Sequence, residues 1–338
     1  MLRLTEIKLE LEHTYDELIN AICFKLSIQP EEVLSYTIFK RSYDARRSAM
    51  CWIYALDVEV QNEAEILENL FNSPHVSPTP DMSYNYVGQA PANLTERPIV
   101  VGFGPCGFFA ALTLAQMGFK PIVLERGKEV RERTKDTWDL WRKNILNPES
   151  NVQFGEGGAG TFSDGKLYSQ ARDPRYLGRK VIQEFIQAGA PDEIAYENHP
   201  HIGTFRLVGM VEKIRETIIG LGGEIRFEHK VSDVLIDEVA GVRQIRGVVL
   251  ADGSELLSNH IVMALGHSSR DTFKMLFERG VYIEAKPFSI GFRVEHPQSV
   301  IDLARLGKNA GNPLLGAAEY RLVHHAKNGR SVYSFCMC

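Results

Sequence analysis

Residues 98–127 read PIVVGFGPCGFFAALTLAQMGFKPIVLERG, and this stretch decides the fold. An apolar run, IVV, meets a glycine turn that matches G-x-G-x-x-G through Gly102, Gly104 and Gly107. A segment compatible with a helix follows, and a second apolar run ends in Glu125. Strand, glycine turn, helix, strand and acid in this order predict the βαβ unit that binds dinucleotides.

The three glycines have separate mechanical roles in such a unit. Gly102 permits the tight turn out of the strand, Gly104 lets a pyrophosphate approach the backbone, and Gly107 lets the helix pack closely. The first turn of the helix offers free N–H groups and a positive dipole end to phosphates. Glu125 lies 18 residues after Gly107, close to the roughly 20 expected for an acid that binds a ribose hydroxyl.

A second stretch, FGEGGAGTFSDGK at residues 154–166, also satisfies G-x-G-x-x-G, through Gly155, Gly157 and Gly160. The preceding residues, PESN, are not a buried strand, and the following SDG is typical of a turn rather than a helix. We therefore reject it as a second βαβ fingerprint. Two interpretations remain, a flexible backbone loop that lies against a flat or anionic ligand and a solvated linker.

Composition bounds the class of protein. The 338 residues suffice for about two domains, and 44% hydrophobic with 24% charged residues is ordinary for a soluble globular protein. The net charge of −5 makes no general case for a nucleic-acid partner. No run approaches the roughly 18 apolar residues of a membrane span, and the N-terminus lacks a signal-peptide core. We expect a cytoplasmic protein without a membrane partner.

The cysteines and histidines predict neither disulfides nor a metal site. Five scattered cysteines without a C-x-x-C pair indicate reduced thiols. Cys336 and Cys338 share a face of a strand-like run, but adjacent same-face thiols seldom form a disulfide. His199 and His201 flank a proline and have no Cys, Asp or His partner at useful spacing.

A small α+β domain with the order βαββα is predicted over residues 1–72, followed by a proline-rich linker at 73–97. The domain carries a basic hairpin, but its 7 Lys or Arg against 13 Asp or Glu give it a net charge of −6. This balance favours a solvated face over a nucleic-acid site. The expected strands are 2–9, 33–41 and 51–60, the helices are 15–26 and 63–71, and the hairpin cations are Lys40, Arg41, Arg46 and Arg47.

The remaining chain divides into a nucleotide-binding domain at 98–270 and part of a substrate domain at 271–338. A strand that alternates in polarity is expected to end at Arg293, Glu295 and His296, where an ion pair and a substrate-facing clamp both stay open. In the first of these domains the expected helices are 129–144, 179–188 and 207–221, and the expected strands are 224–228, 231–236, 243–250, a short piece near 255, and 261–265.

A β-meander after the third parallel strand, and then the apolar strand IVMALG, resemble the FAD fold of the glutathione-reductase type. QFGEGGAGTFSDGKLY, ALGHSSRDTF, KPFSIGFRVEHPQ and YSFCMC resemble the bacterial family of uncharacterised FAD-dependent dehydrogenases, or NAD(P)/FAD-dependent oxidoreductases, over essentially the whole chain. The resemblance implies an α/β fold, a FAD-binding Rossmann-like parallel sheet with a β-meander crossover. The small α+β domain precedes this sheet and part of an inserted substrate domain follows it.

The resemblance also implies which residues meet FAD. The glycine turn, the helix start and the acid face the pyrophosphate and ribose, the 155–166 loop lies by the flavin, and the meander start lies near the adenine. The candidate contacts are Gly102, Gly104, Pro105, Cys106, Gly107, Glu125, Arg126, Gly158, Gly160, Ser163, Asp164, Lys166, Val231 and Gly266.

Two side chains are weak candidates for the chemistry. Lys166 would place a positive charge near the pyrimidine edge of the flavin, and a solvated loop lysine is the competing interpretation. His267 follows the glycine expected to approach the cofactor, and a structural turn histidine competes with a proton donor there.

The function predicted from the sequence is a FAD-dependent oxidoreductase that acts on an unknown small molecule, with NAD(P)H left open as a transient reductant. No second acceptable βαβ for a nicotinamide is present in these residues, which argues against a disulfide-reductase layout. The alternative is a flavin-binding redox-sensing or RNA-associated module, including flavin-dependent RNA modification. Relatives continue beyond a segment like YSFCMC, so we expect a chain that stops at Cys338 to hold FAD weakly.

Overall fold

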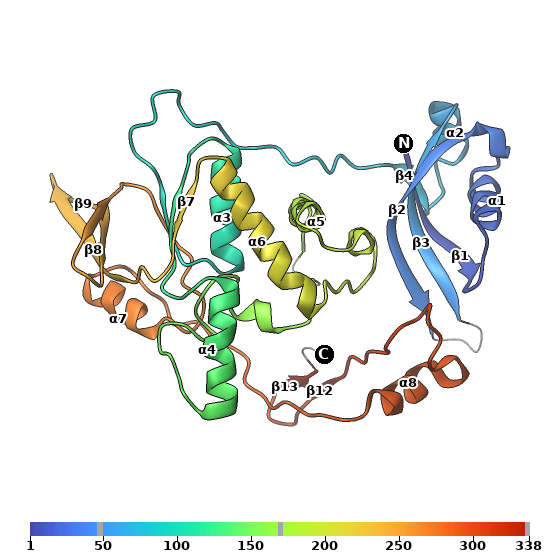
Figure 1. Ribbon diagram of the computed structural model, residues 1–338. Coiled ribbons are helices and arrows are strands. Elements are labelled where there is room, and N and C mark those ends of the chain that lie inside the picture. Colours follow the sequence, from blue (N-terminus) through green and yellow to red (C-terminus); the bar gives the residue numbers. More distant parts are fainter. Residues whose placement is uncertain (46–49, 168–171, 335–338) are drawn as a thin grey trace. The chain divides into compact units, whose positions relative to one another are not determined.

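A computed structural model describes residues 1–45, 50–167 and 172–334 of the chain. These residues form two compact units, each described by itself below (Figure 1). Unit 1 comprises Met1–Asp81, Ala195–Pro200 and Pro287–Cys338, and unit 2 comprises Met82–Ile194 and His201–Lys286. The predictions on Arg46, Arg47, Cys336 and Cys338 fall outside the described residues.

Unit 1 contains a four-stranded antiparallel sheet with the strand order β2-β3-β1-β4. The order of its elements matches the predicted βαββα pattern, and β4 lies inside the segment expected to be a linker. The strands are β1 (Leu2–Glu10), β2 (Val33–Asp44), β3 (Cys51–Val60) and β4 (Val76–Pro78); the helices are α1 (Tyr15–Leu26), α2 (Glu63–Asn69) and the short 3₁₀ turn Pro30–Glu32.

Helix α1 shows how the sequence sets local structure in this unit. The Glu17 amide donates to the Thr14 hydroxyl, and the Thr14 amide donates to the Glu17 carboxylate at 2.7 Å, which is a capping box. Ser27 ends the helix in the left-handed conformation with φ +59°. Leu18 and Ile22 then face the apolar side of the sheet, so both ends and the buried face are encoded locally.

The segment Ala195–Pro200 joins the edge of this small sheet. The Arg41 amide donates to the Tyr196 carbonyl at 2.7 Å, and Arg41 forms a parallel bridge with Glu197. The Arg41 guanidinium pairs with the Glu197 carboxylate and lies 4.6 Å from the centre of the Trp52 ring. One cation of the predicted basic hairpin is therefore already neutralised within the protein.

The predicted strand that ends at Arg293, Glu295 and His296 is wrong, because no described residue between Met263 and Val323 is in a strand. Alternating polarity favours a strand only where a neighbouring strand offers backbone partners. The later elements of unit 1 are α8 (Gln298–Leu306), the 3₁₀ turn Gly307–Asn309, β12 (Val323–His325) and β13 (Ser331–Tyr333).

Unit 2 is built on a parallel four-stranded sheet with the order β11-β5-β6-β7. Helices α3 and α6 lie side by side against it (Figure 1) and share one apolar core with the sheet. The strands are β5 (Ile99–Val101), β6 (Ile122–Leu124), β7 (Glu224–Arg226) and β11 (Ile261–Met263), and these helices are α3 (Pro105–Gln116) and α6 (Thr204–Gly220).

The predicted meander is present and packs through a second apolar core onto the sheet and α7. It consists of β8 (Val231–Val239), β9 (Val242–Leu250) and β10 (Glu255–Leu257) in the order β10-β9-β8. The other helices of unit 2 are α4 (Val130–Lys143), α5 (Leu177–Gln187) and α7 (Arg270–Glu278), and the 3₁₀ turns are Ala159–Phe162 and Asp192–Ala195.

The last boundary between the two units along the chain lies between Lys286 and Pro287, whereas the sequence predicted a domain boundary between 270 and 271. Helix α7 and the residues up to Lys286 cluster with the parallel sheet, and Pro287 begins the last segment of unit 1. Because the strands run parallel, Gly102, Glu125 and Ala264 follow the carboxyl ends of β5, β6 and β11 at one edge of the sheet. Across the described residues, no helix has the length and apolar character to cross a bilayer.

Candidate nucleotide-binding site

Two glycines of the first motif are required by close backbone contacts. Gly102 has φ +98°, and a Cβ there would lie 2.4 Å from the Ala264 carbonyl oxygen. A Cβ on Gly107 would lie 1.9 Å from the Gly102 carbonyl oxygen. Both distances are far below van der Waals contact, so this turn forms only when both positions are glycine.

The start of α3 gives the turn its potential for binding anions. Gly104 is the N-cap of the helix, and Pro105 occupies the first helical position, where a missing N–H is harmless. The amides of Cys106 and Gly107 are in the first turn, where N–H groups have no acceptor within the helix. They lie at the positive end of the helix dipole, which favours phosphate oxygens.

Glu125 ties three backbone segments together. Its carboxylate accepts hydrogen bonds from the amides of Phe103 at 2.7 Å, Gly127 at 2.8 Å and Gly155 at 3.0 Å. The side chain is buried, with 4% exposure of the residue. The acid predicted from the sequence to meet a ribose thus also fixes the glycine turn, the end of β6 and the second glycine motif.

The second glycine motif is a tightly held loop and not the flexible one expected. Gly155, Gly157 and Gly158 are buried and have positive φ angles, and the Gly157 amide donates to the Phe103 carbonyl at 2.9 Å. A Cβ on Gly104 would lie 3.5 Å from the Gly158 Cα. The two glycine segments therefore pack backbone to backbone, and the second continues into a 3₁₀ turn, as its rejection as a βαβ fingerprint predicted.

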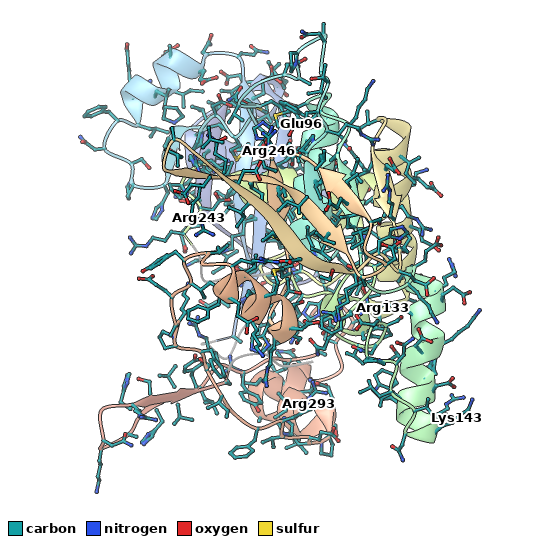
Figure 2. All side chains as sticks on the ribbon, turned by 90° about the vertical axis from the view of Figure 1, so that its left-hand side faces the viewer. Glu96, Arg133, Lys143, Arg243, Arg246 and Arg293 are labelled. Carbon is teal, nitrogen blue, oxygen red and sulfur yellow. The ribbon has the colours of Figure 1, made fainter. Side chains whose placement is uncertain are left out.

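A buried arginine, absent from the predicted site, holds this loop. Arg133 on α4 is 0% exposed and donates to the backbone carbonyls of the 151–158 loop. Figure 2 labels it near the beginning of α4, with Lys143 at the other end. The signal in the sequence was the spacing Val130, Arg133 and Thr137, which places an arginine on the buried face of the helix.

Glu156 in the same loop is a second buried charge that the sequence reading missed. One carboxylate oxygen accepts from the Val130 amide at 2.8 Å and from Arg215 at 3.3 Å. The other oxygen has no hydrogen-bond partner among the described residues. Burial raises the pKa of Glu156 to about 7, because a charged carboxylate loses hydration that these donors only partly replace.

The predicted residues further along the loop lie on a separate stretch of it. The Ser163 hydroxyl donates to the Gly160 carbonyl at 2.6 Å, and Asp164 lies 3.2 Å from a ring nitrogen of His201. Lys166 forms an isolated antiparallel bridge with His201. The structure thus joins Gly158 to the first glycine turn, whereas no atom lies within 4 Å of a Cβ position on Gly160.

The two histidines considered for a metal bind different acids. His201 pairs with Asp164 in unit 2, and His199 pairs with Glu319 at 3.1 Å in unit 1. Within residues 1–45, 50–167 and 172–334, no cluster of three or more His, Cys, Asp or Glu side chains is arranged to hold a metal ion.

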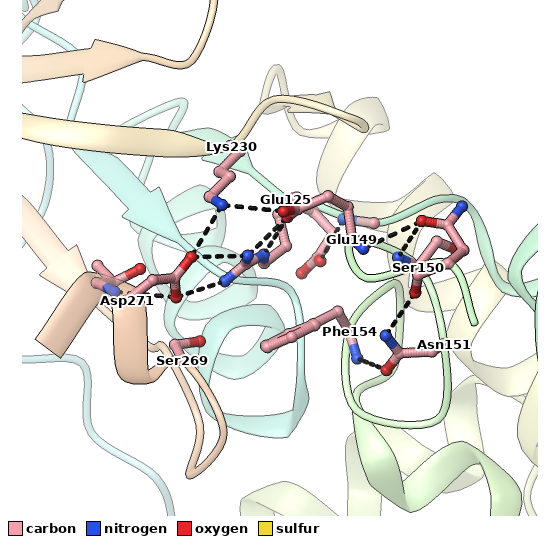
Figure 3. A network of polar contacts seen from close by, with 12 residues as sticks. Glu125, Glu149, Ser150, Asn151, Phe154, Lys230, Ser269 and Asp271 are labelled. Atoms are coloured by element: carbon pink, nitrogen blue, oxygen red, sulfur yellow. Dashed lines mark hydrogen bonds and ion pairs between the residues drawn. The ribbon is translucent and has the colours of Figure 1, made fainter.

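A ring of four charged side chains lies at the carboxyl edge of the sheet (Figure 3). Arg126 donates to Glu149 at 2.7 Å and to both oxygens of Asp271 at 2.9 and 3.0 Å. Lys230 lies 2.9 Å from each of the same two acids. The hydrogen bonds from Arg126 hold the pKa of Asp271 well below its usual range.

Three predicted contacts meet beside this ring. Gly102, Arg126 and Val231 line one small cavity of about 30 Å³ together with Lys230 and Ser269. Its volume is far below the roughly 300 Å³ at the lower end of ligand pockets. Of the ring of charged side chains, Arg126 and Lys230 contribute to the wall of this cavity.

A larger cavity of about 550 Å³ lies beside β11 and α7. Cys106 and Gly266 contribute to its wall, and the rest is mostly apolar, including Met263 and Phe273. His267 follows at the surface and is exposed. Gly266 has φ +68° and no atom within 4 Å of a Cβ position, so its backbone conformation is the reason for glycine.

Comparisons with known families cover the two ends of the chain. Residues 287–338 match a family described as "FAD-dependent protein, C-terminal domain-like", and residues 1–59 match a domain of unknown function, DUF8436. An uncharacterized protein from Clostridium beijerinckii is 42% identical over 345 residues. That alignment covers 100% of this chain, and the chain spans 62% of the length of the relative.

Solved structures that resemble parts of the chain include the following three. Thermovibrio ammonificans THI4 is 17% identical, with a TM-score of 0.38 over 55% of this chain and 64% of its own. The 3-ketosteroid-delta4-(5alpha)-dehydrogenase from Rhodococcus jostii is 14% identical, with a TM-score of 0.32 over 52% and 48%. A variant of E. coli quinol fumarate reductase FrdA is 16% identical, with a TM-score of 0.34 over 54% and 37%. Likenesses at these scores carry no argument about this chain.

Proposed function

We propose that the protein is a FAD-dependent oxidoreductase that acts on a small molecule. One observation carries the proposal. The glycine turn and the start of α3 lie at the carboxyl edge of a parallel sheet, and Glu125 is hydrogen-bonded to this turn. Dinucleotides bind at this edge in open α/β sheets. The family match over residues 287–338 supports FAD among the dinucleotides.

The residues present fit this cofactor on the pyrophosphate side. Gly104 adds no side chain at the start of α3, and Pro105 and Cys106 that follow it are exposed, so this part of the turn can meet phosphate oxygens. On the adenosine side, Arg126 and Val231 line the cavity beside the ring of charges. Gly158, Gly160, Ser163, Asp164 and Lys166 would lie on the flavin side, and Gly266 would pass close to the cofactor.

When bound, FAD supplies hydride and electron transfer, and the protein supplies orientation and electrostatics. The glycine turn and the start of α3 would bind the phosphates, and Glu125 would hold the turn in place. Lys166 would stabilise negative charge near the pyrimidine edge of the ring system. His267, which follows β11 and Gly266 in the chain, is the candidate that could donate a proton.

The alternative of a redox-sensing or RNA-associated module is less well supported. The small sheet domain has a net charge of −6, and its basic hairpin loses one cation to Glu197. Phosphate binding by basic side chains would give an affinity that falls steeply with salt. Retention of RNA with such a salt dependence would favour the alternative.

The test is to purify the chain, identify any bound flavin by absorbance and mass spectrometry, and titrate FAD while following its fluorescence. We expect binding of FAD, and reduction of the bound flavin by NAD(P)H or a metabolite under anaerobic conditions. The Clostridium beijerinckii relative, of whose length this chain spans 62%, is titrated in parallel. Failure of both proteins to bind FAD would contradict the proposed function.

A further inference from the structure

Arg133 uses all its donors on one short loop. The guanidinium donates to the carbonyls of Asn151 and Gly155 at 3.1 Å and of Val152 and Gly158 at 2.9 Å. It also donates to the Glu156 carbonyl. A guanidinium has five N–H groups, so every donor is matched to a backbone acceptor. The arrangement fixes the path of the loop through its backbone and not through its side chains.

The opposite side of the loop is held by the glycine turn. The Gly155 amide donates to Glu125, while the Gly155 carbonyl accepts from Arg133, so this residue lies between a buried anion and a buried cation. The Gly157 amide donates to the carbonyl of Phe103, whose own amide donates to Glu125. These bonds form a closed circuit between the loop and the turn.

Burying the charged guanidinium of Arg133 removes its hydration, which costs free energy that an apolar side chain would not lose. Burial lowers the pKa of Arg133 to about 10, and the guanidinium still carries its charge at neutral pH. In the part of the chain that the structure describes, its hydrogen bonds go to carbonyl groups alone. A buried polar network of this kind serves to specify one backbone conformation.

We propose that Arg133 is a positioning residue of the FAD site, which holds the 151–158 loop against the glycine turn so that the loop forms the second wall of that site. The inference rests on the proposed function, because the wall faces a ligand only if the turn binds one. It adds a residue on α4 that neither the glycine motif nor the acid identifies. Pre-organisation of a loop improves affinity because its ordering is completed before the ligand arrives.

The test compares Arg133→Gln and Arg133→Lys with Ile218→Ala, a buried change on α6 that lowers stability away from the loop. Two quantities are measured, the dissociation constant for FAD and hydrogen exchange of the 151–158 amides without FAD. We expect Arg133→Gln to weaken FAD binding about tenfold or more and to raise exchange in the loop. Arg133→Lys, which keeps the charge and some donors, should lie between Arg133→Gln and the unmodified protein, and Ile218→Ala should change neither quantity.

A second variant displaces the same loop with Arg133 intact. A Cβ on Gly158 would lie 3.0 Å from the Gly104 Cα, so Gly158→Ala pushes the loop away from the turn. It should weaken FAD binding as Arg133→Gln does. If Arg133→Gln does not fold, raised exchange of the 151–158 amides in Gly158→Ala without FAD decides the matter, because this readout does not depend on a direct contact of Gly158 with FAD. Unchanged affinity in either folded variant would overturn the inference, as would equal weakening by Ile218→Ala. An unmodified protein that binds no FAD would overturn the proposed function and the inference with it.

Discussion

The two segments with G-x-G-x-x-G spacing lie against each other but differ in the elements that flank them and in what requires their glycines. The first leaves β5 and opens α3, and Gly102 and Gly107 are required there because backbone meets backbone. The second follows a coil and enters a 3₁₀ turn, and its first glycine is required because the Arg133 side chain passes 2.4 Å from its Cβ position. Identical spacing therefore has no fixed structural meaning, and the flanking elements decide it.

The largest effect is expected in the first motif. Gly107→Ala places a methyl group 1.9 Å from the Gly102 carbonyl oxygen in the tight turn. We expect a loss of more than about 4 kcal/mol in unfolding free energy, together with loss of FAD binding, because backbone cannot yield as a side chain does. Chemical denaturation and flavin titration measure the two effects.

Gly209→Ala is the matched control for this change. Gly209 is also in a helix, and no atom lies within 4 Å of its Cβ position. The alanine should be neutral or stabilise the protein by roughly 0.5–1 kcal/mol. Equal melting temperatures for the two variants would contradict the close contact between Gly107 and Gly102.

A smaller effect should separate two glycines within the second motif. Gly155 has φ +120° and contacts the Arg133 side chain, whereas Gly160 has no positive φ and no atom within 4 Å of its Cβ position. Gly155→Ala should lower the unfolding free energy by about 2–3 kcal/mol, through backbone strain and a displaced arginine. Gly160→Ala should change the melting temperature little, and a large loss there would show that the loop is packed differently.

The last effect depends on pH and concerns Glu156. The pKa of this carboxyl is about 7 in the folded protein, against 4.5 for an ordinary glutamate, so the folded state binds the proton more tightly. Stability from this group is full below about pH 4.5 and falls as pH rises toward 7. Glu156→Gln removes this dependence and keeps an oxygen for the Val130 amide. We expect its stability relative to the unmodified protein to rise by up to about 3 kcal/mol between pH 5 and pH 8.

Glu212→Gln is the control of opposite sign. The hydrogen bond from Arg131 lowers the pKa of Glu212, so its stabilisation is present at neutral pH and is lost in acid. Glu212→Gln should therefore be less stable than the unmodified protein at pH 8 and similar to it in acid. A constant difference across pH for Glu156→Gln would show that its carboxyl is not perturbed by burial.

Much of the fold could be predicted because its signals are local. The capping box at Thr14 and Glu17, the glycine turn before α3 and the meander each involve residues within a few positions of one another. Strand β4 was missed because its three residues, which include Pro78, are too few to show a periodic pattern. Its partner β1 is distant in sequence, at the start of the chain. The strand expected near Arg293 shows the reverse error, a pattern without a partner.

The sequence alone determined that a glycine turn, a helix start and an acid follow one another at the edge of a parallel sheet, because turn and helix geometry restrict those positions locally. Only the tertiary structure decided what holds them together. Glu125 and Gly155, which are hydrogen-bonded, are 30 residues apart. Arg133 on α4 donates a hydrogen bond to the carbonyl of Gly158, 25 residues away. Hydrogen bonds between buried groups distant in sequence depend on how the elements pack, and no local pattern records them.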